Sequence, residues 1–129
     1  MNDNYIIFKN WLDVCFKNDP IDSEIKAIYF GLFETDKGVK LYISGSLIFD
    51  DEDSDWACDL AYNPKYKYCN TIPILNELFE EKENILIRIE KIYNVLTDFI
   101  NKYLKENETE LNDKKLAVGF DDGDLKIIK

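Results

Sequence analysis

The chain contains no histidine among its 129 residues. This absence excludes Ser-His-Asp and Cys-His nucleophilic sites and every zinc site that uses a histidine ligand. Mechanisms based on lysine, carboxylate or water remain, but with only five glycines the chain has no glycine-rich loop to cradle a phosphate. Because the residue types supply no recognisable catalytic set, we expect neither enzymatic activity nor a bound cofactor.

Basic clusters and long apolar runs are also missing. Arg88 is the only arginine, so direct binding to nucleic acid is disfavoured, because phosphate contacts need clustered Lys and Arg. No segment approaches the roughly 20 apolar residues of a membrane span. The three cysteines (Cys15, Cys58 and Cys69) are odd in number and lack metal-type spacing. We therefore expect a cytoplasmic protein whose cysteines are free thiols in the core.

Acidic residues, by contrast, are abundant and concentrated. The net charge is −10, and positions 50–59 hold six acids and no base. Positions 106–124 hold seven acids against two lysines, whereas the other 100 residues carry 13 acids and 14 bases. Charge that serves only solubility would be spread over the chain. Two acidic segments instead predict a directed field that speeds encounter with a cationic partner.

The first half of the chain predicts a helix followed by a hairpin. Apolar residues recur every three or four positions from Asp3 or Asn4 to Asn18, which predicts a helix with one buried face. Positions 25–33 are β-branched and aromatic, and positions 34–38 have turn chemistry. Apolar residues from Val39 to Phe49 alternate with Lys40, Tyr42, Ser44 and Ser46, which predicts a strand with one partly wet face.

The second half predicts a loop, a long helical region and another hairpin. Positions 50–71 have no clean period and contain four aromatic residues that we expect to anchor a long ordered loop. A helical region begins near Pro73, with a break at positions 83–84 and a core-facing stripe from Ile85 to Tyr103. Positions 107–113 form a polar linker, and positions 115–121 and 124–129 form a hairpin around Asp122-Gly123.

This order of elements predicts one α+β domain over residues 1–129. We expect two layers: an antiparallel sheet of about four strands, made of the two hairpins, with the N-terminal helix and the long central helix packed on it. The acidic segments then fall at strand ends or in connections.

The acidic loop admits two kinds of chemistry. An EF-hand beginning at Asp51 fails, because its sixth residue is Trp56 instead of Gly and its twelfth is Tyr62 instead of Glu. A divalent-cation site of another type remains an alternative. Trp56 either folds under the loop as an anchor or projects into a partner as a hot spot. The candidate partner-binding residues are Asp50, Asp51, Glu52, Asp53, Asp55, Trp56, Asp59, Asp121, Asp122 and Asp124.

The acidic stretch Asp50 to Cys58, the aromatic loop and long helix after it, and the terminal segment from Val118 to Asp124 resemble the small acidic immunity proteins of bacterial polymorphic-toxin and contact-dependent inhibition systems. The resemblance implies an α+β domain that protects the producing cell by binding a toxin domain. Together with the charge pattern, it predicts a cytoplasmic inhibitor of a basic, nuclease-like toxin or enzyme. The alternative is a carboxylate-dependent protein or enzyme that holds a divalent metal in the loop at positions 50–59.

Overall fold

The computed structural model describes residues 3–107, 109–121 and 123–129. Its α+β architecture has a four-stranded sheet, an N-terminal helix and a long central helix, so the predicted fold class is confirmed. The elements are α1 (Asp3–Asn18), β1 (Ala27–Thr35), β2 (Gly38–Ser46), the 3-10 helix η1 (Ser54–Cys58), α2 (Pro73–Phe79), α3 (Ile85–Glu106), the 3-10 helix η2 (Glu110–Asp113), β3 (Lys115–Phe120) and β4 (Leu125–Ile127).

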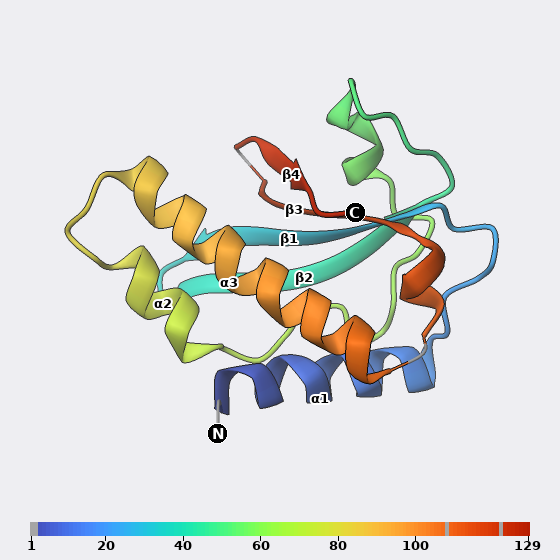
Figure 1. The fold of residues 1–129 in the computed structure, drawn as a ribbon, viewed down its shortest axis with the longest axis horizontal. Coiled ribbons are helices and arrows are strands. Elements are labelled where there is room, and N and C mark those ends of the chain that lie inside the picture. Colours follow the sequence, from blue (N-terminus) through green and yellow to red (C-terminus); the bar gives the residue numbers. More distant parts are fainter. Residues whose placement is uncertain (1–2, 108, 122) are drawn as a thin grey trace.

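The sheet is mixed, with strand order β2-β1-β3-β4. Both predicted hairpins are present as antiparallel pairs, β1 with β2 and β3 with β4. The two hairpins join through β1 and β3, which run parallel, with Ala27 opposite Lys115 and Leu32 opposite Phe120. The sheet is therefore not antiparallel throughout as expected. The reason is that α2 and α3 form a crossover that returns the chain to the end of the sheet where β1 begins (Figure 1).

One face of the sheet packs against the helices and forms the main core. Figure 1 shows α1 and α3 side by side on this face, and α2 leads into α3. The predicted stripe of α3 is buried from Ile92 onwards, but its first member, Ile85, is 42% exposed. The next two residues, Leu86 and Ile87, are exposed as well. The first turn of α3 therefore presents aliphatic side chains to solvent. The largest fully buried side chains come from both layers and from the segments that join them: Phe8, Leu12, Ile28, Phe30, Leu32, Ile43, Ile72, Leu75, Ile92, Leu96, Ile100 and Leu111.

The second face of the sheet is covered at one end by the loop after β2. Trp56 of η1 packs there in a small cluster with Ala27, Tyr29 and Ala117. Because of this cover, the predicted wet face of β2 is dry at Ser44, which is buried. The other end of this face carries Tyr42, which is half-buried.

The long loop is ordered by backbone pairing with the edge strand β2. Tyr62 exchanges two backbone hydrogen bonds with Gly45, and Tyr68 forms an antiparallel bridge with Tyr42. The indole Nε1 of Trp11 adds a 2.8 Å hydrogen bond to the carbonyl of Tyr66. These contacts satisfy backbone groups that an exposed edge would otherwise leave for another chain. The loop therefore has a defined course although it has little regular structure.

Candidate functional site

The acidic loop is shaped by its own carboxylates. Asp50 accepts a hydrogen bond from the backbone N–H of Glu52 at 2.9 Å. Asp53 caps η1 by accepting from the N–H of Asp55 at 3.0 Å. These short local bonds are the turn chemistry that Asp provides. The chain therefore bends tightly here, and its remaining carboxylate oxygens face outward.

Trp56 anchors this loop to the sheet. Its side chain is 2% exposed, and its ring lies 5.3 Å from that of Phe49 and 6.4 Å, edge-on, from that of Tyr29. Of the two interpretations of Trp56, the geometry matches the anchor. At the other end of the turn, Ser46 Oγ donates to Asp59 Oδ2 at 3.0 Å. Trp56 and Asp59 thus attach the C-terminal part of the loop, and the exposed acids from Asp50 to Asp55 precede these attachments in the chain.

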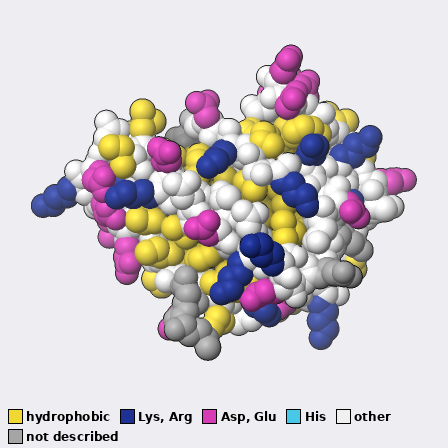
Figure 2. Space-filling model, in the orientation of Figure 1, with side chains coloured by type: hydrophobic (Ala, Val, Ile, Leu, Met, Phe, Trp, Pro, Cys, Tyr) yellow, Lys and Arg dark blue, Asp and Glu magenta, His cyan; other side chains and the backbone are white. Residues whose placement is uncertain are grey.

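The predicted acids of the loop lie on the surface, and exposed aliphatic residues flank them in the sequence. Asp50, Asp51, Glu52, Asp53 and Asp55 are exposed, and Asp59 is half-buried. Three aliphatic side chains flank the acidic stretch in sequence and are about half exposed or more: Leu47 (46%), Ile48 (62%) and Leu60 (52%). In Figure 2 acidic side chains crowd the projecting loop at the top of the molecule, with hydrophobic surface beside them. Sequence periodicity missed these aliphatic residues because it assigned Leu47 to the buried side of a strand.

The carboxylates of the loop do not converge on one point. Within residues 3–107, 109–121 and 123–129, no group of three Asp, Glu or Cys side chains is arranged to hold a metal ion. Asp53 and Asp59 instead bond to the protein's own N–H and O–H groups.

The second acidic segment does not merge with the loop into one surface. Glu106 and Asp113 lie at the far end of α3, whereas Asp121 and Asp124 are exposed at the β3–β4 turn. Asp122, which we also predicted as a partner-binding residue, lies outside the described residues. Among the described acids of this segment, Asp121 borders the same hollow as Cys58, and Asp113 borders a second hollow with Phe49, the residue before Asp50. The segment therefore approaches the loop at two separate points.

That hollow occupies the uncovered end of the second sheet face and has a volume of about 380 Å³. Its aromatic walls are Phe33, Tyr42 and Tyr68, and its polar groups include Ser44, Lys67 and Asp121. The hydroxyl of Tyr42 donates to Asp121 Oδ1 at 2.5 Å. Burial, reinforced by this hydrogen bond, raises the pKa of Tyr42 well above its ordinary value. Tyr42 therefore stays a neutral donor to Asp121 at physiological pH.

Two glycines allow the tyrosine rings to lie flat on the sheet here. Gly31 and Gly119 are neighbours in the parallel register. A Cβ on Gly31 would stand 2.2 Å from Cζ of Tyr42. A Cβ on Gly119 would stand 2.9 Å from Cα of Leu125 in β4 and 3.1 Å from the hydroxyl of Tyr29, which donates to the carbonyl of Gly119 at 2.9 Å. Gly31 is therefore needed for the close approach of the Tyr42 ring, and Gly119 for the close approach of β4 and Tyr29, roles that sequence inspection does not reveal.

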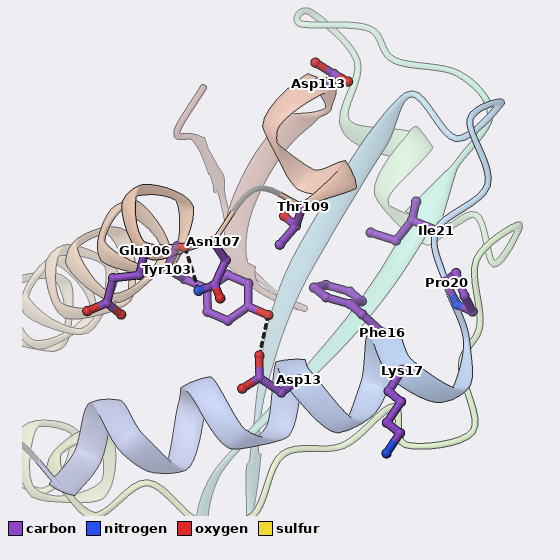
Figure 3. A pocket seen from close by; sticks show the side chains of 10 residues that line it. All are labelled: Asp13, Phe16, Lys17, Pro20, Ile21, Tyr103, Glu106, Asn107, Thr109 and Asp113. Carbon is purple, nitrogen blue, oxygen red and sulfur yellow. Dashed lines mark hydrogen bonds between the residues drawn. The ribbon is translucent and has the colours of Figure 1, made fainter.

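A larger cleft of about 760 Å³ lies between the C-terminal ends of α1 and α3. Figure 3 shows Asp13 of α1 and Tyr103 of α3 pointing toward one another, and the Tyr103 hydroxyl donates to Asp13 Oδ1 at 2.7 Å. Burial raises the pKa of Tyr103. Lys17 and Asp113 point away from this pair (Figure 3). The charged groups of the cleft thus border it without meeting, and we identify no reactive centre there.

The burial of the cysteines and of the loop's aromatic residues corrects two further predictions. Cys15 and Cys69 are buried free thiols as expected, but Cys58 is an exposed free thiol. It is exposed because η1 turns Trp56, its near neighbour, toward the sheet instead. The predicted anchoring aromatics also divide: Trp56 and Tyr62 are buried, whereas the rings of Tyr66 and Tyr68 are 40% and 53% exposed. The loop is held by its backbone at these two tyrosines.

Comparison with known proteins adds no relative: no family model, no curated protein and no solved structure matches this chain. Within the described part of the chain, none of the helices has the length and apolar character needed to cross a membrane.

Proposed function

We propose that this chain is a binding module for a basic protein. The observation that carries the proposal is the acidic loop, whose exposed carboxylates are flanked in the sequence by the exposed aliphatic side chains of Leu47, Ile48 and Leu60. Protein interfaces commonly combine an apolar centre with a polar rim. Here the rim has one sign of charge, so the preferred partner has the opposite sign.

The construction of the loop favours recognition over catalysis. The carboxylates from Asp50 to Asp55 are exposed, and those of Asp50 and Asp53 already accept backbone hydrogen bonds, so they lack the partly dry, concave setting that general acid–base catalysis requires. Exposed acids on a firmly anchored loop keep their charges at fixed positions. Such an arrangement steers an approaching cationic surface into register.

The resemblance to immunity proteins makes this proposal more specific. The partner is then a basic, nuclease-like toxin or enzyme, and the chain is its cytoplasmic inhibitor in a bacterial cell. The alternative, a divalent-metal protein that uses the same loop, has no supporting geometry among the described residues. We therefore develop only the first function.

Co-expression with the products of neighbouring genes tests the proposal. A partner that copurifies with a tag on this chain is then studied by stopped flow at several salt concentrations. We expect the association rate to fall as salt rises, because the Debye length shrinks from about 10 Å at 0.1 M to about 3 Å at 1 M. An association rate that does not change with salt concentration would contradict charge steering.

Two triple variants separate local steering from net charge. The loop variant replaces Asp51, Asp53 and Asp55 by Asn, which keeps the cap of η1 because Asn caps helices as well as Asp. The control variant neutralises three exposed acids elsewhere: Asp36, Glu90 and Asp98. At low salt we expect the loop variant to associate about tenfold more slowly and the control to change little. Equal slowing in both variants would show that only total charge matters.

A further inference from the structure

The hollow on the second sheet face contains three aromatic rings in mutual contact. The ring centres of Phe33, Tyr42 and Tyr68 are 6.0, 6.1 and 6.1 Å apart, and their planes are tilted by 53 to 78°. Such tilted rings turn several π faces toward one small volume. The face of an aromatic ring carries partial negative charge and attracts cations. Tyr68 is 53% exposed, so this volume opens to solvent.

Polar groups in the hollow point to the same kind of ligand. Asp121 contributes an exposed carboxylate, of which Oδ1 already accepts from Tyr42. Ser44 also lines the hollow and is 1% exposed, and its Oγ finds no hydrogen-bond partner among the described residues. A buried hydroxyl without a partner is costly. A ligand that donates N–H groups would satisfy both oxygens.

A cation of the protein itself already lies against these rings. The ammonium of Lys67 is 5.3 Å from the centre of the Tyr42 ring and 5.9 Å from that of Tyr68. Its side chain is long and flexible, and its Nζ takes part in no ion pair among the described residues. The position of Lys67 shows that a cation can lie against these rings.

We propose that this hollow receives one arginine side chain of the basic partner, whose guanidinium displaces the Lys67 ammonium. The inference rests on the proposed function and names the chemical group that the partner inserts. A guanidinium is planar, so it stacks on the tyrosine rings, and its fork of N–H donors reaches both the Asp121 carboxylate and the Ser44 hydroxyl. A lysine of the partner would only replace one ammonium by another.

The test uses a small probe in place of the partner. Uniformly ¹⁵N-labelled protein is titrated with N-acetyl-arginine amide and, separately, with N-acetyl-citrulline amide, in which a neutral urea of similar shape replaces the guanidinium. We expect the arginine probe to shift the amide signals of Gly31, Tyr42 and Asp121 with a millimolar Kd, whereas the citrulline probe leaves them in place. Equal shifts from both probes would overturn the inference.

Variants with a matched control identify the groups responsible. Asp121→Asn and Tyr68→Leu each alter an exposed side chain and should weaken arginine-probe binding about fivefold. Asp124→Asn removes a nearby exposed acid outside the hollow and should change nothing. Lys67→Met removes the competing ammonium and should tighten binding about threefold. Identical affinities for Asp121→Asn and Asp124→Asn would overturn the role of the hollow, and unfolding is checked by circular dichroism.

The outcome is separable from that of the proposed function. If the arginine probe fails to bind while the partner still associates in a salt-dependent way through the acidic loop, the hollow is not the receptor and the binding function stands. If the probe binds as expected but no basic partner copurifies, the guanidinium site stands without the proposed function.

Discussion

Replacing Trp56 by Ala tests the anchor of the acidic loop. A buried Trp→Ala change typically costs about 3–5 kcal/mol of unfolding free energy. Two features of this site determine how much unfolding free energy the variant should lose. The ring packs against Phe49 and Tyr29, which accounts for the loss, but its Nε1 is buried and has no hydrogen-bond partner among the described residues. Removing such a group relieves a penalty of about 1–3 kcal/mol.

We therefore expect a net destabilisation of about 2 kcal/mol for Trp56→Ala, the difference between the midpoints of the two ranges. For a domain of this size, that lowers Tm by about 6–10 °C. Trp56→Phe keeps a ring against the same neighbours and removes the unpaired N–H, so its unfolding free energy should change by less than about 1 kcal/mol. Urea unfolding is followed by far-UV circular dichroism, because each variant changes the fluorescence.

Two results would refute this reasoning. A Trp56→Ala variant with unchanged Tm would show that the ring does not hold the loop. If Trp56→Phe loses as much stability as Trp56→Ala, the indole N–H must make a favourable bond, and the unpaired-donor argument fails.

Gly31→Ala should lower the free energy of unfolding by about 1–3 kcal/mol in urea melts, because its Cβ meets the Tyr42 ring. The control Gly123→Ala places its Cβ 3.7 Å from the nearest atom and should change this free energy by less than about 0.5 kcal/mol. Equal effects would contradict the close-packing argument. In the native protein the exposed Cys58 should react rapidly with a thiol reagent. Burial raises the pKa of Cys69 to about 12, so this thiol should react only after unfolding. A Cys58 that is protected in the native protein would contradict the described turn. Burial raises the pKa of four tyrosines: Tyr5, Tyr29, Tyr42 and Tyr103. Above about pH 10 these tyrosines lose their protons in the unfolded state but keep them in the folded state, so the free energy of unfolding should fall as the pH rises. Urea melts measure this fall, and an unfolding free energy that stays constant up to about pH 11 would argue against the burial of these hydroxyls.

Local patterns in the sequence predicted most elements and missed how they assemble. The alternation from Val39 onwards fixed which residues face the helices, and the periodic apolar residues before Asn18 located α1. Neither pattern contains information about strand partners, so the parallel pairing of β1 with β3 was not predicted. Pairing across 88 positions depends on the path of α3, a tertiary property.

The candidate site shows the same division. The acidic loop was found from six neighbouring carboxylates, a signal that is local by nature. The hollow combines Phe33 of β1, Tyr42 of β2, Tyr68 of the loop and Asp121 after β3, four segments with no shared motif. The unpaired hydroxyl of Ser44 is visible only once its surroundings are known.

The parallel pairing of β1 with β3 also has a consequence for the kinetics of folding. Ala27 has its partner at Lys115, 88 positions later, so the central strand pair closes one of the longest loops available in this chain. Non-local pairing of this kind slows folding. During synthesis on the ribosome, the β1–β2 hairpin must wait with the β1 edge open until β3 emerges. Unpaired edges of nascent strands attract one another, so chains interrupted before β3 should aggregate.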